Sequence, residues 1–228
     1  MAMSESVPAE RRAAEREPAT DLRSEFGTFV RQPSARFIAV VLAGVVVARL
    51  ALARWSVADA VVAVVIVALQ PFTEWVIHVF VLHARPRRVF GREVDLLLAR
   101  KHRLHHRDPR DLDLVFIPMP ALVPGLLVTV AAVVALSPHR SVGLSGLLTG
   151  VTMLLVYEWT HFLIHTRYRP RTRYYRYIHR AHRLHHYRNE RYWFGVTIHL
   201  ADHVLRTFPA RDEVPASPTA RTLGVEPA

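Results

Sequence analysis

Histidine is the residue type whose number and spacing in this chain suggest chemistry. The chain has fourteen histidines in 228 residues. Ten of them form four short groups, which are His78 and His83; His102, His105 and His106; His161 and His165; and His182, His185 and His186. Spacings of three and four residues place side chains on one face of an α-helix. His78 and His83 are five apart, so they can converge only where the helix loosens near its end.

Grouped neutral imidazoles are typical of a metal site. One histidine alone is usually a polar core or surface residue, but ten in four groups are not explained in that way. A single ion takes about four to six ligands, so ten histidines indicate two ions. Imidazole suits iron, zinc, copper and nickel, and the spacing leaves the metal open.

Other polar residues are candidates for holding these ligands in place. A carboxylate bonded to the second ring nitrogen of a ligand fixes its tautomer and orientation. The candidates for this supporting role are Glu74, Glu158, Asp202, His179, His199 and His203. The alternative for Glu74 and Glu158 is that they pair with nearby arginines. His139, in a short turn, is expected to be solvated.

Four apolar runs must position the histidines, at about residues 35–53, 57–83, 112–136 and 142–165. Each is long enough to cross a bilayer as a helix, which needs about 20 residues. We therefore expect an all-α integral membrane protein with four transmembrane helices. Pro71 should bend or break the second run, and Arg49 should extend towards the nearer membrane surface.

Charge predicts the topology of these spans. Arginines concentrate in segments 84–110 and 166–191, and the other two connections are short and nearly uncharged. The positive-inside rule then places both termini and all four histidine groups on the cytosolic side. The net charge of +11 does not indicate a nucleic-acid partner, because the arginines lie beside apolar runs. The absence of cysteine excludes disulfides, thiolate-ligated haem and iron–sulfur clusters.

Composition divides the chain into three parts. Residues 1–33 are polar and of mixed charge, so we expect a disordered cytosolic tail with a short interfacial helix within 22–32. Residues 34–208 form the membrane domain. Residues 209–228 are rich in proline and lack apolar periodicity, which predicts a second disordered tail.

The order HX4H, HX2HH, HX3H, HX2HH resembles the fatty acid hydroxylase/sterol desaturase superfamily, most closely the fatty acid 2-hydroxylases. The resemblance covers about residues 36–208 and includes DLVFIP (113–118), YEWTHFLIH (157–165) and WFGVT (193–197). It implies a four-span fold with a cytosolic helical cap, in which the ten histidines hold two metal ions. It also implies O2-dependent hydroxylation of a C–H bond in a lipid, in particular a fatty-acyl chain, by iron, with zinc able to occupy the site in purified protein. Zinc has no second accessible oxidation state, so it cannot itself activate O2.

The chain departs from the family pattern in two places. Many fatty acid 2-hydroxylases carry a fused haem domain, whereas we expect a separate electron carrier here, docking on the arginine-rich face. After WFGVT the family commonly has an aromatic–Asp pair, and this chain has Ala201–Asp202. We expect residues of DLVFIP and of the bends near Pro118 and Pro120 to line the substrate entrance.

Two other functions remain open from the sequence. A desaturase could use the same ligands to remove two hydrogens. A non-enzymatic membrane metal-binding or transport protein would instead need ligands near the middle of the membrane, whereas these histidines cluster at helix ends and in polar segments.

Overall fold

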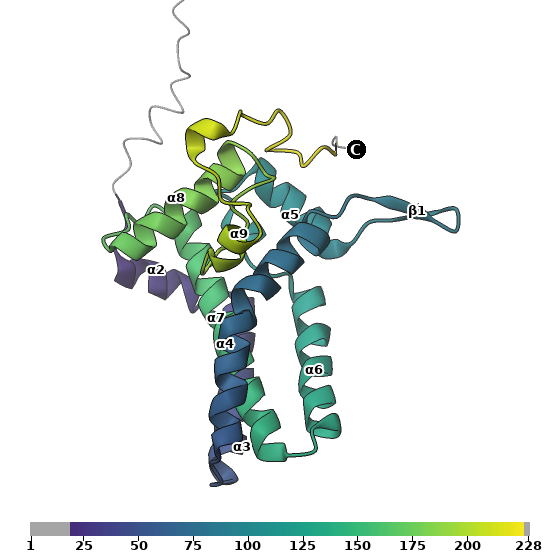
Figure 1. Cartoon of the computed structure of the whole chain (residues 1–228), viewed down its shortest axis with the longest axis vertical. Helices are drawn as coiled ribbons and strands as arrows, with labels where there is room; N and C mark the ends of the chain where they lie inside the picture. The colour runs from purple at the N-terminus through teal and green to yellow at the C-terminus, as the bar shows by residue number, and fades with distance from the viewer. Residues whose placement is uncertain (1–18, 226–228) are drawn as a thin grey trace, which may run out of the picture.

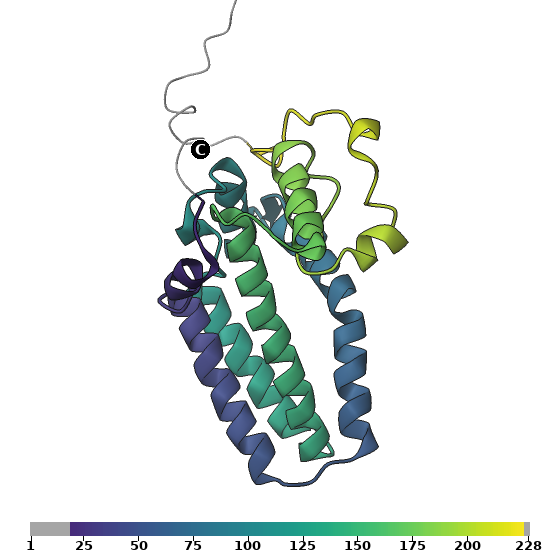
Figure 2. The same ribbon diagram turned by 90° about the vertical axis from the view of Figure 1, so that its left-hand side faces the viewer.

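Four long helices run side by side and form the membrane part of the fold (Figures 1 and 2). The computed structural model describes residues 19–225. The helices are α3 (Pro33–Ala51), α4 (Val57–Ile77), α6 (Met119–Leu136) and α7 (Arg140–His165). Each is long and apolar enough to cross a membrane, α4 together with the turn that follows it and α6 together with the turn before it. The four predicted spans are confirmed as helices.

Helix α7 is the centre of this bundle, because it packs against α3, α4 and α6. Ile38 of α3, Leu122 of α6 and Val151 of α7 form one buried cluster. Nearer the cap, Phe116 and Phe162 stack with ring centroids 5.4 Å apart. Many valines of the spans are exposed, as expected for side chains that face lipid.

The second span is not broken at Pro71, which lies within α4. The helix turns away from the bundle axis near its upper end (Figure 1) and continues as a five-residue π-helix, η1 (His78–Leu82). The structure thus bears out a bend of the second run and not a break.

A helical cap covers one end of the bundle (Figure 2). It contains α5 (Leu97–Arg107), α8 (Arg173–Tyr187), α9 (Leu200–Val204) and two short turns, η2 (Leu112–Leu114) and η3 (Arg211–Glu213). Helix α2 (Leu22–Phe29) lies beside the cap end of the bundle, where a short interfacial helix was predicted. One element was not predicted, an antiparallel hairpin of β1 (Arg87–Val89) and β2 (Arg92–Val94).

Arg49 lies in the last turn of α3 and extends towards the nearer end of the span, where an Nη donates to the Arg54 carbonyl (2.7 Å), but it does not reach water. Its side chain is fully buried. It donates from Nε to Ser145 Oγ (2.7 Å) and from an Nη to Asp59 Oδ1 (3.0 Å). These bonds join α3, α4 and α7 at the end of the bundle far from the cap. The burial of Arg49 is tolerated because a charged side chain that pairs with an acid does not need to reach water.

The segment 209–225 differs from the expected disordered tail, because it packs against the cap. Val214, Ala220 and Leu223 are buried. Ser217 N–H donates to the Arg188 carbonyl (2.7 Å), and Arg188 Nε donates to the Val214 carbonyl (2.7 Å). Backbone partners order this segment, and composition gives no information about them. Residues 1–18 and 226–228, which belong to the predicted disordered tails, lie outside the described residues.

Candidate metal centre

The ten grouped histidines converge inside the cap. The first histidine group contains His78, His83, His102, His106 and His185, and the second contains His105, His161, His165, His182 and His186. In each group, one ring nitrogen per residue lies within 4.8 Å of all the others. Helices α5 and α8 each contribute to both groups, because the first and last histidines of each HRLHH belong to one group and the middle histidine belongs to the other. The structure thus brings together all ten predicted residues.

The inward nitrogens have the spacing of ligands around an ion. In the first group, His102 Nε2 lies 3.1 Å from His78 Nε2 and 3.2 Å from His106 Nε2. In the second group, the Nε2 contacts of His165 with His105 and His182, and of His182 with His186, are 3.0–3.2 Å. Two nitrogens each about 2.1 Å from one ion and about 90° apart lie about 3 Å from each other. The donor sets therefore fit one ion per group.

Backbone carbonyls hold four of these rings in orientation. The Nδ1 atoms of His78, His106, His161 and His185 bond to the carbonyls of Phe194 (2.6 Å), Ala220 (2.8 Å), Val115 (3.0 Å) and Tyr192 (2.8 Å), respectively. A carbonyl only accepts, so each Nδ1 carries the proton. In a neutral imidazole the Nε2 lone pair is then free to face the group.

The π-helix explains the five-residue spacing of the first pair. His83 N–H donates to the His78 carbonyl (3.1 Å), an i to i+5 bond. One extra residue in the turn brings the two rings to a centroid distance of 4.9 Å. The predicted loosening of the helix is confirmed.

Burial keeps the cap histidines uncharged. It lowers the pKa of His106 to about 3, and burial together with neighbouring imidazoles lowers the pKa of His83, His102, His105, His182, His185 and His186 well below 6.5. Within the two histidine groups, the Nε2 atoms of His83, His161 and His185 are buried without a hydrogen-bond partner in the described part of the chain. Buried acceptors of this kind are costly unless something binds them, which also fits a cation.

Glu74 and Glu158 are buried, but neither takes the role predicted for it. Glu74 accepts from the N–H groups of Val196 (3.2 Å) and Thr197 (3.1 Å) and from the Thr197 hydroxyl. Glu158 accepts from Ile117 N–H (2.9 Å). Among the bonds found within residues 19–225, none joins either carboxylate to a ligand ring or to an arginine. The two carboxylates hold the loops WFGVT and DLVFIP, whose carbonyls orient ligands.

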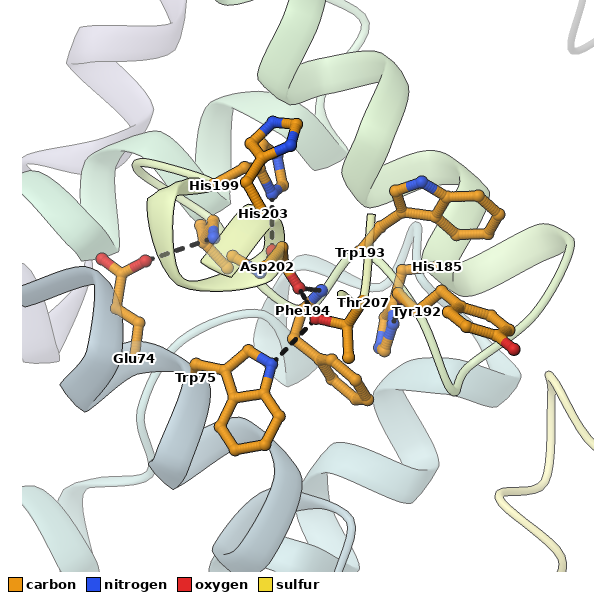
Figure 3. A network of polar contacts seen from close by, with 12 residues as sticks. Glu74, Trp75, His185, Tyr192, Trp193, Phe194, His199, Asp202, His203 and Thr207 are labelled. Atoms are coloured by element: carbon orange, nitrogen blue, oxygen red, sulfur yellow. Dashed lines mark hydrogen bonds and ion pairs between the residues drawn. The ribbon is translucent and has the colours of Figure 1, made fainter. Parts of the chain in front are cut away.

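Asp202 is the centre of a second network that holds WFGVT (Figure 3). Its carboxylate accepts from the N–H groups of Phe194 (3.0 Å) and Gly195 (2.7 Å) and from the Thr207 hydroxyl (2.6 Å). A Cβ at position 195 would lie 2.8 Å from His199 Nδ1 and 2.9 Å from the Ile198 carbonyl oxygen, so glycine is needed for this close packing. Asp202 therefore fixes the backbone of Phe194, whose carbonyl orients His78.

The three other candidate histidines lie outside both groups. His199 Nδ1 bonds to Asp202 Oδ2 (2.9 Å), so it supports the Asp202 network. His203 Nε2 contacts the Tyr177 hydroxyl (2.7 Å) at the surface, and His179 is half-buried on α8. The sequence did not predict the carbonyls of Tyr192 and Ala220 as partners of His185 and His106, because residues of every type have a backbone carbonyl.

An elongated apolar cavity of about 750 Å³ leads to the first histidine group. Its walls come mainly from α4, α6 and α7. It extends from His78 and Phe194 at the cap to Ser137 and Gly143 at the far end. Ile117 and Ala121 line it, whereas Pro118 and Pro120 are not among its lining residues. The predicted entrance region thus forms part of the cavity wall through Ile117 of DLVFIP, whereas the two prolines do not.

Comparisons with known proteins agree with this geometry. Two dihydroceramide fatty acyl 2-hydroxylases of Arabidopsis thaliana, FAH1 and FAH2, are 30% and 31% identical over 141 residues. Those matches cover 60% of this chain but only 56% and 55% of the relatives, so the chain matches about half the length of these curated proteins. The solved structure of full-length Scs7p, in which only the hydroxylase domain is visible, superposes with a TM-score of 0.62 at 25% identity and covers 79% of this chain and 68% of that one. A sequence model of the fatty acid hydroxylase family matches residues 63–207, and the chain therefore belongs to that family.

Proposed function

We propose that this chain is a membrane hydroxylase that inserts one oxygen atom of O2 into a C–H bond of a fatty-acyl chain at a di-iron centre. The observation that carries the proposal is that two groups of five convergent imidazole nitrogens lie at one end of an elongated apolar cavity. His78 belongs both to the first group and to the cavity wall. A lipid chain in the cavity therefore ends beside the metal ligands.

The ten histidines would hold the two ions, five to each group. Imidazole suits several metals, but oxidation by O2 needs a metal with more than one accessible oxidation state, which zinc lacks. When bound, iron supplies this redox chemistry. The protein supplies neutral ligands in fixed orientation, because burial keeps the cap histidines uncharged and carbonyls hold four rings.

The cavity matches a single alkyl chain in length and character. From Val62 in α4 to His78 at the start of η1 the wall advances by 16 residues, or about 24 Å of helix. An extended alkyl chain zigzags, so each C–C bond of about 1.5 Å advances it by about 1.3 Å, and a chain of about 20 carbons fills this length. The names of the two Arabidopsis relatives refer to fatty-acyl hydroxylation, which supports the same substrate class.

Phe194 places the apolar wall directly against the ligands. Its ring lies 5.4–5.6 Å, between centroids, from the rings of His78, His83 and His185. It also lines the cavity and is almost fully buried. Phe194 therefore excludes water from the end of the cavity and limits how closely a chain can approach the first group.

The cap and both termini would lie in the cytosol. Support comes from the arginine-rich segments 84–110 and 166–191, which lie at the cap end of the spans. A reduced carrier protein would dock on this basic face and supply the two electrons that, with two protons, convert the second oxygen atom to water.

Lipid profiling with labelled oxygen tests the reaction. The full chain is expressed in a host of defined lipids with a compatible reductase and grown under 18O2. A hydroxylated acyl chain that carries one 18O atom is the expected product. New double bonds without label would show that the chain is a desaturase and would overturn the assignment as a hydroxylase.

Metal content tests the site separately. His105→Ala and His165→Ala should each lose bound iron and the hydroxylated product. His139→Ala is the matched control, because His139 is an exposed histidine at the opposite end of the bundle and should keep both. If both ligand variants retained two ions per chain, the ligand assignment would be overturned.

A further inference from the structure

The β1–β2 hairpin is a basic and apolar projection that neither the histidine groups nor the cavity uses. It extends sideways from the cap end, past α6 (Figure 1), and every residue from Arg87 to Val94 is exposed. It begins five residues after Leu82, where the second span ends. The hairpin thus lies beside the bundle at the level where the spans leave the bilayer.

The tip of the hairpin presents an aromatic side chain in a conformation that aromatic residues rarely adopt. Phe90 and Gly91 form the two-residue loop, with φ of +50° and +76°. This loop favours Asn-Gly or Gly-Gly, and a bulky residue at positive φ is strained. Phe90 is nonetheless completely exposed, so nothing within the described chain compensates the strain. Strain of this kind points to a function at the site.

Strand pairing gives the hairpin one mixed face. Residues directly opposite each other in an antiparallel pair share a face. Arg87 pairs with Val94 and Val89 pairs with Arg92, whereas Arg88 pairs with Glu93 on the other face. Two valines beside two arginines suit the membrane interface, where apolar groups enter the acyl boundary and arginines reach the phosphates.

The hairpin is held firmly at its base. Buried Arg103 of α5 donates to the Ala84 carbonyl (2.9 Å) on one side and to Asp95 Oδ2 (2.5 Å) on the other. Just outside these anchors, Leu82 and Leu98 line the apolar cavity. The orientation of the hairpin is therefore coupled to the cap end of the cavity.

We propose that the β1–β2 hairpin lies on the membrane surface, with Phe90 in the headgroup–acyl boundary and Arg87 and Arg92 on the phosphates of anionic lipids. Its charge complements such a surface, where each arginine is worth about a fivefold preference. The hairpin would hold the cap end of the cavity at headgroup level. An acidic protein is the alternative occupant of the same surface.

Site-directed spin labelling tests this placement, and the absence of cysteine makes a single label site straightforward. Phe90→Cys is labelled in nanodiscs of phosphatidylcholine with and without phosphatidylglycerol. Collisions with lipid-soluble O2 are compared with collisions with a water-soluble nickel chelate. Asp212→Cys is the control, because Asp212 is exposed on η3 of the cap.

We expect the label at position 90 to be at least about fivefold less accessible to the chelate in anionic nanodiscs than the label at position 212. Changing Arg87 and Arg92 to glutamine should remove the dependence on phosphatidylglycerol while circular dichroism shows an unchanged helix content. Equal chelate access at both positions in both lipids would overturn the proposal. The proposal would also be overturned if the label at position 90 became protected from the chelate only after an acidic carrier protein was added. The measurement needs neither metal nor turnover, so it stands apart from the hydroxylase proposal.

Discussion

Replacing Asp202 with asparagine exchanges one carboxylate oxygen for an NH2 group at the centre of the network that holds WFGVT. Oδ1 accepts from Phe194 N–H and the Thr207 hydroxyl, and Oδ2 accepts from Gly195 N–H and His199 Nδ1. Thr207 and His199 could reorient to accept from an amide. A backbone N–H cannot, so the new NH2 must face either Phe194 N–H or Gly195 N–H.

The expected cost follows from this count. One buried backbone donor loses its acceptor, which costs about 1–3 kcal/mol, and the two bonds to the remaining oxygen change from a charged to a neutral acceptor at about 1 kcal/mol each. The sum is about 3–5 kcal/mol. For a domain of this size it corresponds to a fall of about 6–20 °C in the thermal unfolding midpoint.

The metal centre should also respond, because Phe194 connects the network to a ligand. Its carbonyl accepts from His78 Nδ1 (2.6 Å). Loss of a group that supports a ligand typically lowers metal affinity about 10–100-fold. Burial opposes ionisation of Asp202, but bonds from His199, Thr207 and Gly195 keep its pKa below the ordinary value. The stabilisation by this carboxylate is present above pH 4 and is lost only in more acidic solution, so the effect of Asp202→Asn should be the same from pH 6 to pH 8.

Thermal unfolding and bound metal per chain, both measured on detergent-solubilised protein, check this prediction. Asp212→Asn is the matched control, because Asp212 is exposed in the same cap and should leave both quantities unchanged. The reasoning is refuted if Asp202→Asn unfolds within about 2 °C of the parent and binds metal as tightly.

Four further substitutions or conditions give separate tests. Gly150→Leu should shift hydroxylated products towards shorter acyl chains in lipid profiles, because Gly150 lines the cavity with open space beside it; an unchanged chain-length profile would contradict that binding mode. Arg49→Met should lower the unfolding temperature by leaving Asp59 without its cation, and a second change, Asp59→Asn, should recover part of the lost unfolding temperature. Ending the chain at residue 208 removes the carbonyl of Ala220 that orients His106, so it should speed metal release to a chelator; release at the parent rate would exclude a role for this segment. Metal-free protein should lose stability as the pH falls from 7 to 5, because the unfolded chain takes up protons near pH 6.5 while burial keeps the pKa of His106 near 3; a constant unfolding temperature over this range would contradict it.

The spans and the ligands could be predicted because each leaves a local pattern in the chain. Apolar length marks the spans, and imidazole spacing marks a helix face. Two crossings between the second and third histidine groups bring all four groups to one end of the bundle. Even the five-residue gap between His78 and His83 carried information, since it required the loosened turn found as η1.

Contacts between distant segments left no such pattern. The buried partners of Arg49 could not be predicted, because Asp59 belongs to the next helix and Ser145 lies 96 residues away. The hairpin was missed because three-residue strands are too short to show an alternation that can be distinguished from a basic loop.

The least predictable part of the site is made of backbone atoms. Every residue has a carbonyl, so the sequence does not mark Val115, Phe194 or Ala220 as partners of ligands. Yet each lies in a segment that a buried carboxylate holds: Glu158 binds Ile117 N–H, Asp202 binds Phe194 N–H, and Glu190 accepts from the Thr219 hydroxyl (2.6 Å). Burying an acid is costly unless it is hydrogen-bonded, so acids that lack arginine partners must find backbone or hydroxyl donors. Acidic residues are the minority in this chain, with 19 against 30 basic residues. The three acids Glu158, Glu190 and Asp202 are therefore the sequence feature that indicates where the backbone is fixed around the metal centre.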